Sequence, residues 1–263
     1  RSHALAMIAL LGRARMPLIV TRRVAFTPRS ARLKYGPRVT RFIAISNAVR
    51  DAMAEGGIDP SRISVVHSGI APRVEHVTAR DWRGELGWPE NSVVAGIVGA
   101  MTSEKGLDQL GEISQHLDAS ARADLRVVLL GGDKTIDTRA GGLQVHPAGF
   151  VEAIDEAIAG LDLLLHPSRS EGLGTSIIDA MSHGIPPVAF AVGGIPEVIE
   201  HQKSGILVPP GDVGTFAAWV SRLTADSGLR AQLGEAAKVR AKTFDASLMT
   251  KETEAVYQEV LSG

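Results

Sequence analysis

The fold of this 263-residue chain is decided by one stretch, HPSRSEGLGTSIIDAMSHG at residues 166–184. The apolar residues 162–166 that lead into it predict a buried strand, and residues 175–183 predict a helix that ends at Gly184. A buried strand joined to a helix by a glycine-rich turn is the repeating unit of parallel sheets covered by helices. The stretch therefore predicts an α/β fold.

The same unit recurs before and after this stretch. Its predicted strands are residues 93–98, 126–130, 143–145, 162–166, 187–190 and 205–208, and its predicted helices are residues 107–117, 151–159, 175–183, 212–224, 228–242 and 246–261. Elements of these lengths connect through right-handed crossovers. They predict a doubly wound parallel sheet with helices on both faces.

A shorter set of elements comes first in the chain. Its predicted members are a helix at residues 4–11 and strands at residues 17–21, 41–46 and 63–66. Ser46 or Asn47 can cap a further helix that ends at Gly56 and Gly57. These elements predict a second, smaller Rossmann-like domain.

The domain boundary is predicted at residues 71–90, which hold prolines and glycines and no long periodic run. We therefore expect a partial first domain at residues 1–75 and a second domain at residues 76–245. A final helix at residues 246–263 is expected to pack back on the first domain.

The composition excludes several classes of protein. Apolar residues make up 44% of the chain and charged residues 22%, as in ordinary soluble globular domains. The chain has no cysteine, which excludes disulfides, thiolate metal sites and cysteine nucleophiles and favours a reducing, cytoplasmic setting. The apolar run at residues 4–11 is far shorter than the about 20 residues of a membrane-spanning helix.

The net charge of −1 hides a strong asymmetry. Up to Arg80 the chain has 14 Lys and Arg against four Asp and Glu, a net charge of +10, and the remainder carries −11. The basic residues crowd at Arg13, Arg15, Arg22, Arg23, Arg29, Arg32, Lys34, Arg38 and Arg41. Such a split predicts an anionic partner, with an anionic membrane surface as one candidate, or simply a solvated face.

Ligands of doubly wound sheets bind beyond the carboxyl ends of the strands, so the strand-to-helix turns are the places to search. The first candidate turn runs from Gly99 to Gly106 and carries Lys105. Glycines allow a close backbone approach, and the helix start and the lysine favour an anion. The turn has neither a Walker nor a dinucleotide fingerprint. Its alternative interpretation is an ordinary turn with a surface lysine.

The second candidate turn follows His166. Gly172, Gly174 and Thr175 place backbone donors at a helix start, which suits a phosphate. Glu171 lies on the loop, and Asp179 lies eight residues later, about two turns into the helix. Carboxylates accept hydrogen bonds from hydroxyls, as in a sugar or a ribose. The alternative is that Glu171 caps the turn and Asp179 faces solvent.

Together these motifs resemble a known family. They are Ser168-Arg-Ser-Glu171-Gly-Leu-Gly174, Asp179-Ala-Met181, Gly184-Ile-Pro186, Gly193-Gly-Ile-Pro-Glu197, Val98-Gly99, Lys105-Gly106, Leu130-Gly-Gly132, and Ile45-Ser46 with Val65-Val66-His67-Ser68-Gly69. The combination resembles the retaining, glycogen-synthase-like glycosyltransferases of family 4. Their GT-B fold consists of two Rossmann-like domains. The resemblance covers nearly the whole chain.

The resemblance implies roles for single residues. Lys105 would hold the diphosphate of a nucleotide sugar, and Glu171 would bind hydroxyls of the transferred sugar, which makes these two the candidate catalytic residues. Asp179 would bind the ribose, and residues 147–151 would face the base. The remaining implied donor-binding residues are Gly99, Ser168, Gly172, Leu173, Gly174 and Thr175.

The chain departs from the family pattern at three positions. Ala100 stands where many members have an arginine, so one phosphate contact is missing. Asp179 is one methylene shorter than the family's second glutamate. Arg23 stands about where relatives carry a histidine of the active cleft; it cannot act as a base, but Arg22 and Arg23 are candidates for contact with the acceptor or a phosphate.

The start of the chain is a further departure. Relatives have a complete first domain, whereas this chain begins partway through it, and two or three opening strands are absent. The strand at residues 17–21 would then expose an unpaired edge. We expect a second chain to cover this edge, or the first domain to be poorly ordered.

The resemblance implies a retaining glycosyltransferase of the EC 2.4 type that uses a UDP-, GDP- or ADP-sugar. The acceptor would be a sugar, a lipid-linked or a phosphate-bearing molecule at a cytoplasmic site, which could be the inner membrane surface. With no Asp-x-Asp motif we expect no metal, and we expect no cofactor and no nucleic acid. The alternative is a noncatalytic or partner-dependent nucleotide-sugar-binding remnant. A glycosidase or a sugar-nucleotide epimerase fits the motifs less well.

Overall fold

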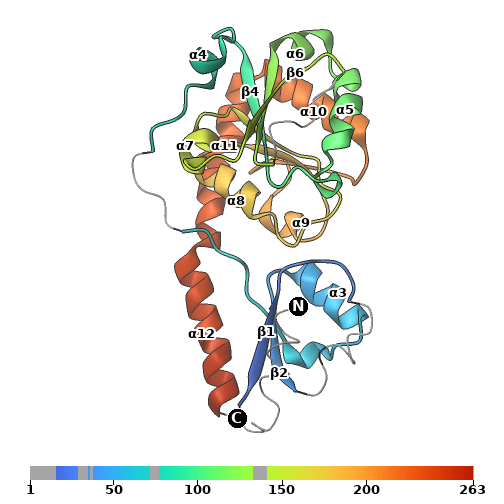
Figure 1. The fold of residues 1–263 in the computed structure, drawn as a ribbon, viewed down its shortest axis with the longest axis vertical. Helices are drawn as coiled ribbons and strands as arrows, with labels where there is room; N and C mark the ends of the chain where they lie inside the picture. Colours follow the sequence, from blue (N-terminus) through green and yellow to red (C-terminus); the bar gives the residue numbers. More distant parts are fainter. Residues whose placement is uncertain (1–15, 29–34, 36–37, 72–76, 133–140, 263) are drawn as a thin grey trace.

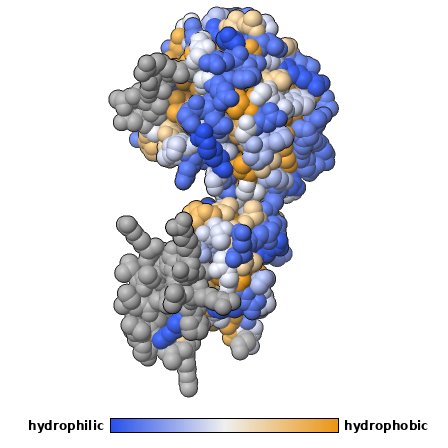
Figure 2. Space-filling model, turned by 90° about the vertical axis from the view of Figure 1, so that its right-hand side faces the viewer, coloured by the Kyte–Doolittle hydropathy of each residue, from blue (hydrophilic) through white to orange (hydrophobic). Residues whose placement is uncertain are grey.

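The computed structural model describes residues 16–28, 35, 38–71, 77–132 and 141–262. The chain forms two lobes joined by a narrow waist (Figures 1 and 2). The predicted helix at residues 4–11 lies outside the described residues. So do Arg13, Arg15, Arg29, Arg32 and Lys34, and residues 72–76 of the domain boundary expected at residues 71–90.

The larger lobe is built on a six-stranded parallel sheet in the order β6-β5-β4-β7-β8-β9. The strands are β4 (Val93–Val98), β5 (Leu125–Leu130), β6 (Gln144–Gly149), β7 (Leu163–His166), β8 (Pro187–Phe190) and β9 (Ile206–Val208). The strand order reverses between β4 and β7. In a doubly wound sheet this reversal is the switch point, beyond which ligands bind.

Helices cover both faces of this sheet (Figure 1). They are α4 (Trp82–Leu86), α5 (Leu110–His116), α6 (Ala119–Asp124), α7 (Ile154–Ala159), α8 (Thr175–Ser182), α9 (Ile195–Val198), α10 (Val213–Ala225) and α11 (Ser227–Ala241). Neighbouring strand residues enter opposite cores: Val94 packs with the α8 and α11 side chains, and Val93 with those of α5 and α10. Burial on both faces explains the continuous apolar runs of the strands.

The smaller lobe holds a three-stranded parallel sheet in the order β1-β2-β3. Its elements are β1 (Leu18–Arg22), β2 (Val39–Ala44), α3 (Asn47–Glu55) and β3 (Ile63–Val65). Ser46 caps α3 by accepting a hydrogen bond from the Val49 amide, as predicted. Within the described ranges β1 pairs with β2 alone.

The two chain segments that cross the waist lie side by side. Ile70 bridges to Asp245, with the Ile70 amide donating to the Phe244 carbonyl at 2.9 Å. The last helix, α12 (Ala246–Ser262), then runs along the smaller lobe (Figure 1). Val256 of α12 packs against Ile43 of β2.

The structure corrects several predicted bounds. β6 is longer than the strand predicted at residues 143–145, because Pro147 is tolerated on an edge strand of the sheet. The predicted helix at residues 107–117 begins as a 3₁₀ turn, Leu107–Gln109, before α5. The helix predicted at residues 151–159 starts only at Ile154, and the short helices α4 and α6 were not predicted.

Candidate active site

The two candidate turns meet at the switch point of the larger sheet. Lys105 ends a 3₁₀ turn that follows β4, and Glu171 lies on the loop that follows β7. Lys105 Nζ donates to Glu171 Oε1, and both side chains are largely buried, with 23% and 14% of their surfaces exposed. The residues predicted to hold a diphosphate and a sugar therefore form an ion pair with each other.

A buried histidine and a buried serine contact the carboxylate of Glu171. His166 Nε2 lies 2.9 Å from Glu171 Oε1, and Ser168 Oγ lies 3.0 Å from His166 Nε2 and 3.3 Å from Glu171 Oε1. Both supporting side chains are 1% exposed. The hydroxyl of Ser168 thus bonds to both His166 and Glu171 and helps to position the carboxylate, and its predicted contact with the donor stays a prediction.

The electrostatics of this cluster fix its charges. Burial lowers the pKa of His166, and nearby Lys105 lowers it further, so the ring is neutral at pH 7. Burial alone would raise the pKa of Glu171, but the hydrogen bonds from His166 and Lys105 and the lysine charge hold it well below its usual range. Glu171 is therefore a carboxylate that can accept hydroxyl hydrogen bonds and cannot supply a proton.

Contacts missed in the sequence lock the two turns together. Arg169 forms a bidentate ion pair with Asp108 at 2.6 and 2.7 Å and donates to the Ser103 carbonyl at 2.8 Å. Gly106 has φ of +71°, and a Cβ there would lie 1.9 Å from the Pro167 carbonyl oxygen, so the turn requires glycine. One feature of the sequence could have identified His166 as a site residue: it is a polar residue at the end of an apolar strand.

The start of α8 presents the predicted backbone donors. Gly174 precedes the helix with φ of +90°, and its carbonyl accepts the Ile177 amide, so the Thr175 and Ser176 amides are the ones that a helix start leaves for a ligand. Leu173 is 1% exposed and packs in the hydrophobic core. Thr175 and Asp179 lie half-buried on α8. Their ligand roles stay predictions.

The smaller lobe supplies the other wall of the site. A cavity of about 190 Å³ is lined by Arg23, Val24, Ala25, Phe26, Glu104, Lys105, Ser170, Glu171 and Gly172. Ligand sites for drug-sized molecules enclose roughly 300–1,000 Å³, so this cavity can hold only one end of a nucleotide sugar.

The neighbouring residues Arg22 and Arg23 differ in exposure at this wall of the site. Arg23 is exposed and lines the cavity. Arg22 is 7% exposed; its guanidinium donates to the Tyr35 hydroxyl at 3.0 Å and to the Phe26 carbonyl. Arg22 is thus bonded within the smaller lobe, whereas Arg23 is open to the cavity, and a ligand contact by either arginine stays a prediction.

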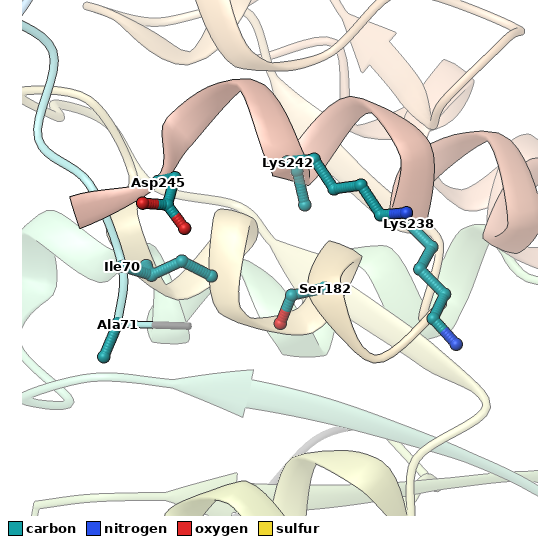
Figure 3. Close-up of a pocket in the computed structure, with 7 residues that line it drawn as sticks. Ile70, Ala71, Ser182, Lys238, Lys242 and Asp245 are labelled. Carbon is teal, nitrogen blue, oxygen red and sulfur yellow. The ribbon is translucent and has the colours of Figure 1, made fainter. Parts of the chain in front are cut away.

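A second cavity of about 270 Å³ lies at the waist (Figure 3). It is lined by Ile70, Ala71, Ser182, Lys238, Ala241, Lys242 and Asp245. None of the predicted site residues lines it, and we assign no ligand to it.

Other predicted features were searched within the described residues. No group of three or more His, Asp or Glu lies close enough there to hold a metal ion, and no helix there has the length and apolarity to span a membrane. The segment expected to face the base, residues 147–151, contains Phe150, which is 83% exposed at the end of β6.

Comparisons with known proteins bear on this geometry. The family model described as "Glycosyl transferases group 1" matches residues 78–240, more than half of the chain. A D-inositol 3-phosphate glycosyltransferase of Streptomyces bingchenggensis is 28% identical over 85% of this chain and 53% of its own length. The sulfoquinovosyl transferase SQD2 of Arabidopsis thaliana is 30% identical over 74% of this chain and 40% of its own length.

Solved structures share the fold. Anabaena Alr3699/HepE in complex with UDP-glucose superposes with a TM-score of 0.83 at 23% identity, over 97% of this chain and 76% of that chain. The lipopolysaccharide outer core galactosyltransferase WaaB gives a TM-score of 0.72 at 18% identity, over 98% and 73%. The present chain spans about half the length of the sequence relatives that it matches.

Proposed function

Because this chain belongs to the glycosyl transferases group 1 family and has the GT-B fold, we propose that it transfers a sugar from a nucleotide-diphosphate sugar to an acceptor. One observation carries the proposal: Lys105 and Glu171, from the turns after the neighbouring strands β4 and β7, meet in one cavity. A cation beside a carboxylate suits a ligand with a diphosphate next to sugar hydroxyls.

In the proposed complex the diphosphate competes with Glu171 for the Lys105 ammonium. Glu171 then keeps its bonds to His166 and Ser168 and accepts hydroxyls of the transferred sugar. The first-turn amides of α8 face the anionic end of the donor. Asp179 binds the ribose, one turn further along the helix.

We propose transfer with retention of anomeric configuration. The bond between the anomeric carbon and the diphosphate oxygen breaks, and the leaving diphosphate takes the electron pair. The acceptor oxygen then bonds to the same face of the sugar, and its proton passes to the leaving phosphate oxygen. Lys105 and the helix amides stabilise the charge that develops on the diphosphate, and no protein nucleophile is required.

The donor and acceptor are proposals of class only. The UDP-glucose complex of the structurally similar Alr3699/HepE supports UDP as the first nucleotide to test, with GDP and ADP as the others. The name of the inositol 3-phosphate relatives supports a phosphate-bearing acceptor, which Arg23 would face from the smaller lobe.

We further propose a cytoplasmic enzyme that works at the inner membrane surface, supported by the +10 charge of residues 1–80. Basic residues near anionic lipid contribute about 1 kcal/mol each and are screened by salt. Co-sedimentation with anionic vesicles at low salt, lost at high salt, is the expected result. No binding at low salt would leave a solvated basic face and remove the membrane from the proposal.

A second candidate function is nucleotide-sugar binding without turnover, or turnover only with a partner chain. It is favoured by the small first sheet, in which β1 pairs with β2 alone among the described residues, and by Ala100 in place of an arginine.

A thermal-shift screen with UDP, GDP, ADP and their sugars tests binding, since a ligand of the folded state raises the melting temperature. Radiolabelled nucleotide sugars then separate the two candidates. Release of the label to an acceptor or to water supports the transferase, and binding without release supports the second candidate. Absence of any shift with all the nucleotides would contradict both.

A further inference from the structure

The two lobes are joined beside the candidate active site by five hydrogen bonds that end on two residues of the larger lobe. One of them runs from Ser46 Oγ to the Gly172 carbonyl at 2.7 Å. The other four end on the carboxylate of Glu197. Gly172 follows Glu171 directly, so the first of these bonds holds the loop that carries the candidate sugar-binding carboxylate.

Glu197 reaches from α9 to the N-terminus of α3, which faces it across the gap between the lobes (Figure 1). Its carboxylate accepts the Asn47 amide at 2.9 Å, Asn47 Nδ2 at 2.7 Å and the Ala48 amide at 3.0 Å. These amides belong to the first turn of α3, where no intrahelical acceptor exists and the helix dipole is positive. His67 Nε2 completes the set at 2.9 Å.

The charge of Glu197 is stabilised by this arrangement. Burial alone would raise its pKa, but the hydrogen bonds from Asn47, His67 and Ala48 outweigh burial and lower it. The contact is therefore between a carboxylate and a helix start at neutral pH. It uses all the free amides that α3 offers at its first two positions.

The five hydrogen bonds that end on Gly172 and Glu197 form a joint between the lobes, and the backbones at this joint are closely packed. A Cβ on Gly194 would lie 2.9 Å from the Cβ of Ser46, and a Cβ on Gly172 would lie 2.2 Å from the Arg23 carbonyl oxygen. The joint thus sets one specific separation of the lobes. At that separation Arg23 and Glu171 line the same cavity.

The joint is also connected to the waist. Arg240 donates to the carbonyls of Glu197 at 2.6 Å and Val198 at 3.1 Å, and its guanidinium lies over the Phe244 ring at 5.2 Å. The same ring meets His67 edge-on at 5.8 Å. Phe244 stands next to Asp245, where the two chain segments cross, so α9 is held against the pivot of the lobes.

We infer that Glu197 is a positioning residue: by binding the start of α3 it holds the lobes closed, and through the Ser46–Gly172 bond it fixes the loop of Glu171. Glu197 itself lies on the joint and does not line the cavity. The closing role is independent of the proposed function, and only the benefit to donor use rests on it.

Spin-label distances test the closing role without any ligand. Because the chain has no cysteine, labels can be placed at Asp51→Cys on α3 and Gln232→Cys on α11, both exposed. Glu197→Gln keeps the side-chain volume but replaces one acceptor oxygen with a donor. Glu235→Gln, an exposed glutamate on α11, is the matched control.

A second variant removes the donors instead of the acceptor. Asn47→Pro deletes both the Asn47 amide and the Nδ2 group. Proline is accepted at the first helical position, and Ser46 before it is already extended at φ −159° and ψ 163°, as a residue before proline must be. This variant decides the matter if Glu197→Gln fails to fold.

We expect both variants to lengthen and broaden the label separation, with no change in the control. Amide exchange of residues 170–176, followed by mass spectrometry, is expected to rise about tenfold if the open fraction of the protein rises about tenfold. Unchanged distances in both variants would overturn the closing role. Longer distances with unchanged exchange would overturn the positioning of the Glu171 loop. Both readouts stand even if no nucleotide sugar binds.

Discussion

The two walls of the candidate active site are built in different ways. The wall from the larger lobe is bonded within itself: Lys105, His166 and Ser168 all reach Glu171. The wall from the smaller lobe is an exposed strand end, where Val24 and Phe26 leave 41% and 61% of their surfaces open. The wall from the larger lobe is thus preorganised by its own side chains, whereas the wall from the smaller lobe depends on the hydrogen bonds between the lobes at Gly172 and Glu197.

The strongest test of the preorganised wall is Glu171→Gln. It removes the carboxylate but keeps the shape, and we expect transfer to fall about 100-fold, the cost typical of one lost transition-state contact. Binding of UDP alone should stay within a few-fold, since UDP has no transferred sugar. Initial rates with a labelled donor give the measurement, with Glu235→Gln as the control. Unchanged transfer would show that Glu171 does not bind the sugar.

Lys105→Ala is expected to have the next largest effect. Hydrogen bonds to charged groups contribute roughly 1.5–3 kcal/mol, so the affinity for UDP should fall about 10- to 100-fold while the affinity for uridine hardly changes. Calorimetric titration of the two ligands measures the difference. If both affinities fall equally, Lys105 supports the fold and does not bind the diphosphate.

The arginine pair at the other wall sharpens the comparison. Arg22→Ala leaves the Tyr35 hydroxyl and the Phe26 carbonyl without their buried partner and should lower the free energy of unfolding by about 1–3 kcal/mol. Arg23→Ala should change it by less than about 0.5 kcal/mol, as at an ordinary exposed position.

Inositol 3-phosphate serves as a probe of the acceptor side in these two variants. Arg23→Ala is expected to raise its KM and Arg22→Ala to leave it unchanged, once both proteins are shown to be folded. If instead Arg23→Ala lowers the free energy of unfolding and Arg22→Ala raises the KM, the roles proposed for the two arginines are wrong.

The smallest expected effect is on the pH dependence of stability. Burial lowers the pKa of His166 in the folded state below its ordinary value of 6.5, so in the pH range between the folded and unfolded pKa the unfolded chain binds more protons. The stabilisation is complete above about pH 6.5 and is lost as the pH falls, by up to about 1.4 kcal/mol per pH unit. Below about pH 4.5 the lowered pKa of Glu171 adds a loss of the same sign.

Urea unfolding of the wild type and His166→Gln between pH 7 and pH 5 isolates the histidine from the glutamate. The variant should show the shallower decline in this range. If the free energy of unfolding of the wild type and that of His166→Gln decline in parallel, His166 is not kept neutral in the folded state.

The fold of the larger lobe could be predicted closely because strands β4, β5, β7 and β8 are buried on both faces. Val93–Val98 and Pro187–Phe190 were predicted with their observed bounds. β6 could not be, since Pro147 breaks a strand pattern everywhere except at an edge, and edge position is a property of the assembled sheet. The five-residue helix α4 contains Gly84 and ends at Gly87, so it has too few turns to produce a periodic pattern.

The candidate site was predictable in part. Lys105 and Glu171 stand out because they follow buried strands in glycine-rich turns, and strand order alone decides that they meet. The contacts of Arg169 with Asp108, and of Glu197 with Asn47, connect residues 61 and 150 positions apart. No local sequence pattern predicts contacts between residues so far apart in the chain. Arg22 is the last residue of β1 and Arg23 follows it, so their different burial depends on where the strand ends.

A crystal structure of the chain with the nucleotide sugar chosen by the thermal-shift screen tests the central claim most directly. We expect the diphosphate to bind Lys105 Nζ, a sugar hydroxyl to donate to the Glu171 carboxylate, and the ribose to lie near Asp179. A donor bound instead in the cavity of Ile70 and Lys242, or away from the switch point of the sheet, would contradict it.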